Sequence, residues 1–297
     1  MNIIEFLYKN KTYLGYTNLN SPDLIHVFQT QSKFSDILQE CFRKNNDILD
    51  TLRSLSSKPF LLNSVDEPLI WLVPALLEPL TSVHVFGFGY THKNRVLNEL
   101  HSTLPERFYK GDGSTLFAHK TSITMPKDAC SVGEEAELVV IYFIGKEGSP
   151  HLIGYAMGND LSDPLMRRQN TKQFAASKLR PSAIGPELCL GPLPNTVKGH
   201  VSIKRNGKSV WSAHYSTGTS QFLYSMEAIT HFFVEMADPI PGNLYYVFLG
   251  ADKHSFSDNF LIENEDTICI QSENFILPLS NQVLMDIPIV LEEARSE

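Results

Sequence analysis

A continuous apolar run at residues 138–145, LVVIYFIG, constrains the fold of this chain more than any other segment. Strands with one solvated face alternate apolar and polar residues, whereas a strand that is apolar throughout is typical of one buried on both faces. The run therefore predicts a strand that is covered on both sides. Glu134, Glu135 and Glu137 stand directly before it, so we expect charged groups at the end of a buried strand.

Short β-rich runs, separated by glycine, proline or asparagine, dominate the chain from residue 83 onward. They predict strands at residues 83–88, 138–144, 152–157, 201–204, 210–214, 245–249 and 267–271. Asn206-Gly207 joins two of these runs, and this dipeptide readily adopts the positive φ angles of a tight turn. A β-hairpin is therefore predicted around it.

One long helix is predicted among these strands. Its apolar stripe consists of Phe222, Met226, Ile229, Phe233 and Met236. We expect Thr219 or Ser220 to cap its start and Asp238-Pro239 to end it. A second, shorter helix is expected after Thr91, and its inward-facing residues would be Val96, Leu97 and Leu100.

The first 80 residues differ in pattern from the rest. Apolar side chains recur at three- and four-residue intervals across residues 34–55, which predicts one or two helices. Prolines interrupt the apolar stretch at residues 69–80, which indicates a packed connector. We expect residues 1–80 to form a small N-terminal α/β part and residues 81–297 to form a second, larger domain.

Composition argues against several classes of protein. The 297 residues carry a formal net charge of −8, so the chain has no surplus of cations with which a general nucleic-acid binder contacts phosphates. No segment approaches the roughly 20 apolar residues of a membrane span, and residues 1–13 lack the charge order of a secretory signal. The four cysteines lie far apart, which favours buried, reduced thiols and a cytoplasmic location.

Several familiar catalytic motifs are also absent from the sequence. Gly87 and Gly89 follow a predicted strand, but His92 occupies the next glycine position of a dinucleotide-binding fingerprint. The chain has neither a GxSxG nucleophile elbow nor an HExxH zinc helix. These observations argue against a dinucleotide enzyme, a serine hydrolase and a zinc peptidase of the usual types.

The acidic residues before the apolar run are the clearest chemical signal. Because strand side chains alternate, Glu135 and Glu137 are expected on the same side, and their charges must be solvated, protonated or neutralised by a cation. Asp160 ends the run GYAMGND, where it is either a turn residue or a third carboxylate of the same site. Three such oxygen ligands would suit Mg²⁺ or Mn²⁺.

Five short motifs occur in an order that resembles the fumarylacetoacetate hydrolase superfamily. They are FYKGDGS (108–114), GEEAEL (133–138), GYAMGNDLSD (154–163), SKLR (177–180) and IGPEL (184–188). The similarity covers roughly residues 82–297 and looks closest to the branch associated with 2-keto-3-deoxy-L-arabonate dehydratase and bacterial sugar-acid breakdown. It implies an α+β fold, a mixed β-sandwich roll that is often dimeric.

The resemblance also assigns roles to individual residues. It implies one Mg²⁺ held by Glu135, Glu137 and Asp160. It further implies that Lys178 contacts the substrate near the metal, and that Lys110 corresponds to the lysine of the family's FxK segment. Such a site withdraws electrons from the keto group of a 2-oxo acid, which makes its third carbon acidic.

The general base is less clearly marked. His92 lies just after a predicted strand, where it either transfers protons or packs at a helix start. Many hydrolytic relatives have a catalytic histidine slightly further along, followed by a glutamate, and here that position is Arg95. The histidine–glutamate pair that activates water in those relatives is therefore not visible here. Its absence favours dehydration over C–C hydrolysis.

Two other departures concern the substrate. The usual Ser-Ala-Arg-Asp is replaced here by Ser-Asp-Pro-Leu, so Arg167 or Arg168 would have to take the role of the arginine. A Thr-Gly-Thr segment of the relatives aligns with Leu249, Gly250 and Ala251, which leaves backbone donors but no hydroxyl.

Asp112 and Ser114 lie in a glycine-rich segment, where they either form a turn or contact the substrate. The sequence thus predicts a Mg²⁺- or Mn²⁺-dependent cytoplasmic enzyme, a homodimer, that dehydrates a 2-keto-3-deoxy sugar acid. Two alternatives remain open. One is an acylpyruvate hydrolase or decarboxylase on the same metal, and the other is a non-catalytic sugar-acid-binding member of the family.

Overall fold

Strand β10 (Ala136–Ile144) lies at the centre of the fold, and all nine of its residues are buried. Leu138, Val140 and Tyr142 contribute to one hydrophobic core. Val139 and Ile141, which point the opposite way, contribute to a second core. The prediction of a strand covered on both faces is therefore confirmed.

The computed structural model describes residues 1–62, 66–95 and 104–285. In these residues the strands form two sheets, of twelve and five strands. The main path of the larger sheet is β4 (Ser57–Leu61), β3 (Leu24–Phe28), β2 (Lys11–Thr17), β1 (Asn2–Tyr8), β12 (Ser182–Leu190), β11 (Pro150–Asp160), β10, β15 (Leu244–Phe248), β6 (Val83–Gly89) and β7 (Glu106–Asp112). Two short strands, β5 (Ile70–Trp71) and β8 (Leu116–Phe117), pair with β1 and β12.

The smaller sheet has the order β14 (Lys208–Thr217), β13 (Val197–Arg205), β16 (Thr267–Ser272), β17 (Leu279–Leu284) and β9 (Ile123–Thr124). Val201, Ile203 and Ile270 of this sheet share a core with one face of β10. The mixed sandwich and the α+β class predicted from the sequence are confirmed. The β13–β14 hairpin is confirmed too, with positive φ at Asn206 and Gly207.

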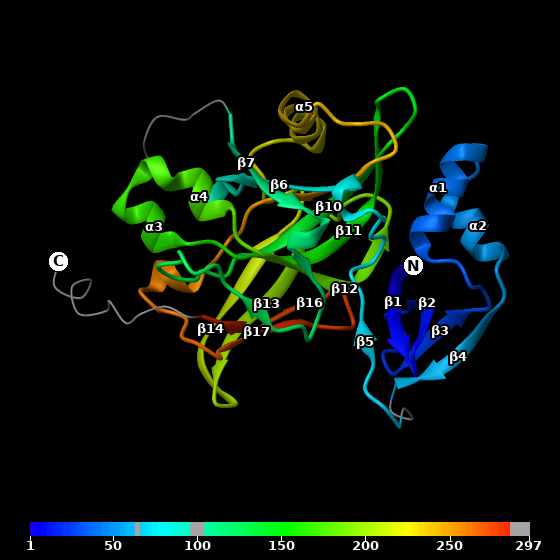
Figure 1. Ribbon diagram of the computed structural model, residues 1–297, viewed down its shortest axis with the longest axis horizontal. Helices are drawn as coiled ribbons and strands as arrows, with labels where there is room; N and C mark the ends of the chain where they lie inside the picture. The colour runs from blue at the N-terminus through cyan, green and yellow to red at the C-terminus, as the bar shows by residue number, and fades with distance from the viewer. Residues whose placement is uncertain (63–65, 96–103, 286–297) are drawn as a thin grey trace.

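The N-terminal strands extend the larger sheet, because β1 pairs antiparallel with β12. Helices α1 (Phe34–Lys44) and α2 (Ile48–Ser54) cover the face of β10 that the smaller sheet leaves open, through buried residues such as Phe34, Leu38 and Leu52. Figure 1 shows these blue elements gathered on one side of the molecule. The boundary at residue 80, which falls beside a short 3-10 turn (Leu80–Ser82), stays a prediction.

Helix α5 (Met226–Ala237) begins later than predicted. Ser225, rather than Thr219 or Ser220, caps its start, since its hydroxyl accepts a hydrogen bond from Ala228 N. The preceding segment forms turns and bends, and an isolated β-bridge joins Phe222 to His92 after β6. Lys93 N donates to Gln221 O and Leu223 N to Thr91 O. These long-range bonds hold the chain out of the helix. Asp238 ends α5 as expected.

The remaining helices are α3 (Pro164–Gln169) and α4 (Phe174–Lys178), which lie on the side of the molecule opposite α1 and α2 (Figure 1). The helix expected around Val96, Leu97 and Leu100 falls outside the described residues. Among the described helices, none has the length and apolarity that crossing a membrane requires.

The four cysteines are free thiols, as expected, but the prediction that all are buried is wrong. Cys41 is buried, Cys189 and Cys269 are half-buried, and Cys130 is exposed. Cys130 lies in the loop before the acidic segment, where its backbone N–H donates to Asp163 and its side chain is left outward.

His119 ties the two parts of the chain together. Its ring packs edge-on against Trp71 of β5, and its Nδ1 accepts a hydrogen bond from Ser280 N of β17. Burial, reinforced by the nearby charge of Lys120, lowers the pKa of His119 to about 4. The folded chain thus holds this imidazole in its neutral form.

We predict that His119 makes the protein less stable as the pH falls. The unfolded chain binds the proton more tightly, with a pKa near 6.5, so the free energy of unfolding decreases between pH 7 and pH 5. His119→Asn keeps an acceptor but cannot titrate, so its decrease should be smaller by about 2 kcal/mol. Urea unfolding at both pH values measures this difference, and equal decreases in the two proteins would refute it.

Candidate metal centre and its cleft

Three carboxylates meet where β10 begins and β11 ends. Antiparallel pairing sets Glu137 opposite Gly158, and the N–H of Asp160 donates to Glu135 O at 3.0 Å. Each of Glu135, Glu137 and Asp160 offers an oxygen, and these oxygens all lie within 4.8 Å of one another. The structure therefore brings together the three residues that the sequence singled out as metal ligands.

Two lysines neutralise part of this negative charge. Lys178 Nζ lies 2.7 Å from Glu135 Oε1 and 2.9 Å from Asp160 Oδ2, and it sits 4.7 Å from the centre of the Phe108 ring. Lys110 Nζ contacts Asp160 Oδ1 and donates to two backbone carbonyls, Leu161 O at 3.0 Å and Lys178 O at 2.9 Å. Both ammonium groups are thus fixed against the carboxylates.

Burial and these contacts change the proton affinities of the cluster. Burial raises the pKa of Glu135, but its ion pair and hydrogen bond with Lys178 outweigh this effect and hold the pKa at about 2. Burial, Asp160 and Glu135 together raise the pKa of Glu137 well above its usual range. Burial lowers the pKa of Lys178, yet the surrounding carboxylates leave it above its ordinary value.

One oxygen of the cluster fits a cation directly. Glu137 Oε2 accepts a hydrogen bond from Gly250 N at 2.7 Å, whereas Oε1 is buried and has no hydrogen-bond partner among the described residues. A buried carboxylate oxygen without a partner is costly unless a proton or a cation compensates it. Oxygen ligands of this kind suit Mg²⁺ or Mn²⁺, so the donor set fits the predicted ion.

A fourth buried carboxylate stabilises the wall of the site. Glu134 Oε1 accepts from Ser255 N at 2.7 Å, and its other oxygen accepts from the Ser255 hydroxyl at 2.5 Å. Burial raises the pKa of Glu134 to about 7. These bonds fix the residue after His254, whose ring lines the same cleft.

Sequence reasoning missed both Ser255 and His254. Their contact with the acidic segment joins positions about 120 residues apart, and no local motif marks it. The alternation of side chains before β10 suggested no role for Glu134. The structure shows that Glu134 is buried, so this residue is not a solvated group at the end of a strand.

The cleft beside the carboxylates consists of two adjoining cavities of about 320 and 90 Å³. Both are lined by Tyr90, Glu135, Arg167, Lys178 and His254. The larger cavity also reaches Arg168 and Phe256, and the smaller reaches Gly250 and Ala251. The size of the whole cleft is typical of a site for a small molecule.

Gly250 and Ala251 line this cleft, in keeping with their expected place. Gly250 has a φ of +84°, and an added Cβ would come 2.4 Å from the Thr91 hydroxyl oxygen, so glycine is required there. This conformation aims its N–H at Glu137. Ala251 contributes no side-chain donor.

The side chain of Lys110 lies behind the carboxylates and not in the cleft. Its side chain is fully buried and does not line either cavity of the cleft. It contacts Asp160 from behind, so it orders the carboxylate rather than reaching a molecule in the cleft. A contact of Lys110 with a substrate stays a prediction.

His92 is also separated from the cleft. Its Nε2 lies 3.0 Å from the hydroxyl of Thr217, its Nδ1 lies 3.3 Å from the hydroxyl of Thr91, and Phe222 packs edge-on against the ring. The residue lines neither cavity of the cleft. His92 thus packs between the segment after β6 and the segment before α5, and its role in proton transfer stays a prediction.

Asp112 and Ser114 form a turn at the far end of β7. Asp112 Oδ1 accepts from both the N–H and the hydroxyl of Ser114, at 2.9 and 2.5 Å. Glu106, at the other end of β7, lines the cleft, and six residue steps along the strand place Asp112 roughly 20 Å from it. The structure therefore supports turn formation and not substrate contact for these two residues.

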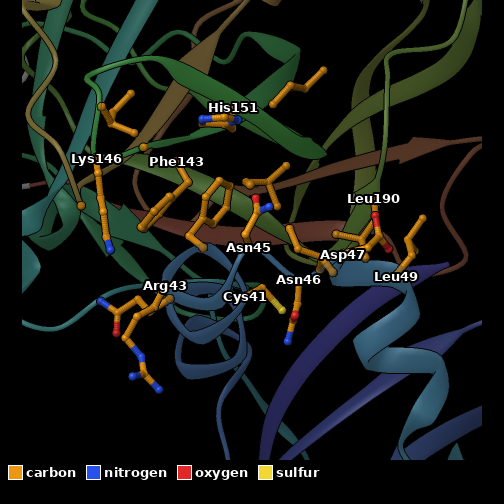
Figure 2. A pocket seen from close by; sticks show the side chains of 18 of the residues that line it. Cys41, Arg43, Asn45, Asn46, Asp47, Leu49, Phe143, Lys146, His151 and Leu190 are labelled. Carbon is orange, nitrogen blue, oxygen red and sulfur yellow. The ribbon is translucent and has the colours of Figure 1, made fainter.

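A cavity of about 650 Å³, larger than either cavity of this cleft, lies elsewhere. It is formed between the α1–α2 helices and the β10–β11 hairpin. Figure 2 shows Arg43 and Lys146 on one side of it and Leu49 and Leu190 on another. No group of metal-ligating side chains was found there among the described residues, so size alone does not identify the site.

Comparison with protein-family models gives no match for this chain, and comparison with curated protein sequences gives none either. Solved structures do match. The apo form of 2-keto-3-deoxy-D-arabinonate dehydratase has a TM-score of 0.72 and 17% identity, over 97% of this chain and 100% of that one. The same enzyme complexed with magnesium and 2,5-dioxopentanoate gives 0.70 and 16%, with the same coverage.

Fumarylacetoacetate hydrolase from the psychrophilic Exiguobacterium antarcticum is similar as well. Its TM-score is 0.65 at 16% identity, over 96% of this chain and 99% of the hydrolase chain. The chain therefore has the fold of the fumarylacetoacetate hydrolase superfamily, as its motifs predicted, and that fold includes residues 1–80. This similarity establishes the fold, and the activity is argued separately below.

We predict that Mg²⁺ stabilises the folded protein through Glu137. At about 100 times its dissociation constant, an ion that binds only the folded state adds about 2.7 kcal/mol to the free energy of unfolding. Glu137→Gln keeps the shape but removes the charge, so the Mg²⁺-dependent rise in Tm should be largely lost. Thermal unfolding with and without Mg²⁺ measures it.

Glu147→Gln is the matched control, because Glu147 is an exposed residue at the turn between β10 and β11. This variant should retain the full response to Mg²⁺. An equal response in Glu137→Gln and in the unaltered protein would contradict the assignment of the site.

Proposed function

We propose that this chain is a Mg²⁺- or Mn²⁺-dependent enzyme that acts on a small 2-oxo acid, and that it dehydrates a 2-keto-3-deoxy sugar acid. The observation that carries the proposal is the convergence of Glu135, Glu137 and Asp160 beside Lys178, with Glu135 and Lys178 lining the cleft. A dehydratase of similar fold, solved with magnesium and 2,5-dioxopentanoate, supports the same reaction class.

Glu135, Glu137 and Asp160 would hold the ion. When bound, a divalent cation polarises the keto group of a 2-oxo acid and makes the hydrogens on its third carbon more acidic. The partnerless Oε1 of Glu137 supports this role. The contact of Lys110 with Asp160 keeps the third carboxylate in place from behind.

Lys178 would stabilise negative charge on the substrate. Its ammonium lines the cleft, and the neighbouring carboxylates favour the protonated form. A positive charge held at low exposure interacts strongly with an oxygen that becomes anionic during proton abstraction. Lys178 is therefore proposed as a catalytic residue, in agreement with the motif SKLR.

His254 is the histidine that lines this cleft in the described part of the chain, and it replaces His92 as the proposed proton carrier. Its position follows from the bonds between Glu134 and Ser255. An imidazole beside the cleft suits proton transfer near neutral pH.

Dehydration is preferred to C–C hydrolysis because the histidine after β6 does not reach the cleft. The hydroxyls of Thr91 and Thr217 lie against both ring nitrogens of His92, so it is not placed to activate a water there. Decarboxylation on the same metal is the remaining enzymatic alternative.

A specific observation keeps a non-catalytic binding protein as a second candidate. The segment aligned with Thr-Gly-Thr lacks both hydroxyls, at Leu249 and Ala251, and the N–H of Gly250 donates to Glu137, so three donors for a substrate carboxylate are lost or engaged. The resemblance in sequence further supports a homodimer, a cytoplasmic location and a small-molecule partner rather than nucleic acid or a membrane.

The reaction is tested with purified protein and Mg²⁺. A panel of 2-keto-3-deoxy sugar acids and acylpyruvates is incubated, and products are followed by mass spectrometry. Loss of one water marks dehydration, and release of pyruvate marks C–C hydrolysis. Turnover that persists in EDTA and in Glu137→Gln would contradict the metal-dependent mechanism, whereas ligand-induced stabilisation without product would support the binding protein.

Lys178→Met separates charge stabilisation from metal binding. Loss of the ammonium removes a competitor for Glu135 and Asp160, so the affinity for Mg²⁺ should be retained or increase. Turnover should fall by about 10²–10³-fold, as for the loss of a single charge-stabilising group. Calorimetric titration with Mg²⁺ and a single-substrate assay measure the two effects, and a variant that keeps full turnover would exclude Lys178 from the chemistry.

A further inference from the structure

Two histidines lie against each other on the smaller sheet, apart from the candidate metal centre. His200 of β13 and His214 of β14 are directly opposite in the antiparallel ladder, and the centres of their rings are 5.0 Å apart. The planes of the two rings are tilted by 56°. Both residues stand outside the proposed chemistry, so the pair calls for a separate explanation.

The pair lies on the outer face of this sheet. The next residues along the two strands, Val201 and Tyr215, are buried in the core that the smaller sheet shares with β10. Because side chains alternate along a strand, His200 and His214 point the opposite way. His214 is exposed and His200 is half-buried, so both rings are accessible from solvent.

The strands beneath the pair are held in register. An added Cβ at Gly199 of β13 would overlap the ring of Tyr215, so glycine is required for this ring to cross the strand. The Tyr215 hydroxyl then donates to Gln271 O of β16 at 3.2 Å, and Gln271 is the ladder partner of His200. Three neighbouring strands are thus tied together beside the histidines. A fixed backbone reduces the ordering needed to bring both rings to one ligand.

Both imidazoles are uncommitted. No hydrogen bond or ion pair is recorded for either ring within the described residues, where their recorded contact is with each other. The residues next along this face, Lys198 and Glu273, are opposite in charge, and the Glu273 carboxylate accepts from Lys198 N at 3.1 Å. Their charges offset each other near the pair. Imidazole nitrogen is the commonest side-chain ligand of metals in proteins.

The spacing of the rings suits a single metal ion. Zinc binds an imidazole nitrogen at about 2.0–2.1 Å, so two nitrogens on one ion lie at most about 4.2 Å apart. Rings with centres 5.0 Å apart reach this separation by rotation about their side-chain bonds. Zn²⁺, Ni²⁺ and Cu²⁺ favour imidazole, whereas Mg²⁺ and Mn²⁺ favour oxygen ligands. The histidine pair therefore suits a different class of ion from the three carboxylates.

We propose that His200 and His214 form a second metal site, for a divalent transition-metal ion of the Zn²⁺, Ni²⁺ and Cu²⁺ group. Each ring binds the ion through one nitrogen, and water fills the remaining positions. Two protein ligands are fewer than the four of a structural zinc site, so the ion is exchangeable and does not hold the fold together. The site is independent of the carboxylate centre and of the proposed reaction.

Cu²⁺ is the probe for this site, because electron paramagnetic resonance distinguishes its nitrogen ligands from oxygen ligands. Tag-free protein receives two equivalents of Cu²⁺, enough for the carboxylate centre and the histidine pair. Cu²⁺ at the carboxylates would have oxygen ligands, whereas we expect a second component with couplings to two imidazole nitrogens. A spectrum in which no component shows two such nitrogens would overturn the proposal.

Substitutions then locate the signal. His200→Asn and His214→Asn each remove one ligand and keep a polar side chain on the outer face. Loss of an outer-shell partner alone lowers metal affinity by about 10- to 100-fold, so the affinity for nitrogen-bound Cu²⁺ should fall at least about tenfold in either variant. His231→Asn, which changes an exposed histidine on α5, is the matched control and should keep the two-nitrogen signal.

Both variants of the pair should also keep the Mg²⁺-dependent rise in Tm, which reports an intact fold and an intact carboxylate centre. A two-nitrogen signal of unchanged affinity in His200→Asn and in His214→Asn would exclude the pair as the ligands.

Discussion

The antiparallel pairing of β10 with β11 is the interaction on which both the core and the candidate site depend. Along β10 the alternating side chains enter two different hydrophobic cores. At the end of the same pair, the register sets Asp160 beside Glu135 and Glu137. A shift by one residue would turn the side chains of β10 to the opposite faces and separate the carboxylates. Folding and site geometry are therefore specified together.

Placing several carboxylates at the end of a buried strand has a free-energy cost that the surroundings offset. Lys110 and Lys178 supply two positive charges, and backbone N–H groups bind Glu134 and Glu137. The arrangement still leaves one oxygen of Glu137 without a partner in the described residues. A buried polar atom left unpaired in this way is typical of functional sites and not of sites optimised for stability. This unpaired oxygen supports the proposed metal dependence.

The sequence predicted the features that local pattern determines. Apolar continuity predicted the central strand, alternation placed Glu135 and Glu137 on one side, and Asn206-Gly207 predicted the hairpin. It failed where distant segments decide the structure. Hydrogen bonds from the segment after β6 keep residues before Ser225 out of helix α5, and no local propensity reveals them.

The same distinction explains the site residues. Glu135, Glu137, Asp160 and Lys178 belong to short motifs and come together as predicted, whereas His254 depends on the remote bond between Glu134 and Ser255. His92 follows β6 as predicted and Lys110 lies in β7, but the packing of their side chains, which sequence alone does not show, places neither of them in the lining of the cleft.

A crystal structure of the protein with Mn²⁺, with anomalous scattering recorded, tests the central claim most directly. We expect a single strong anomalous peak, which marks a Mn²⁺ ion bound by oxygens of Glu135, Glu137 and Asp160. Glu137 Oε1 should be one of these ligand atoms. The account also predicts that Lys178 Nζ moves away from at least one of its two carboxylates to admit the ion. An anomalous peak elsewhere, with Lys178 still paired to both Glu135 and Asp160, would contradict it.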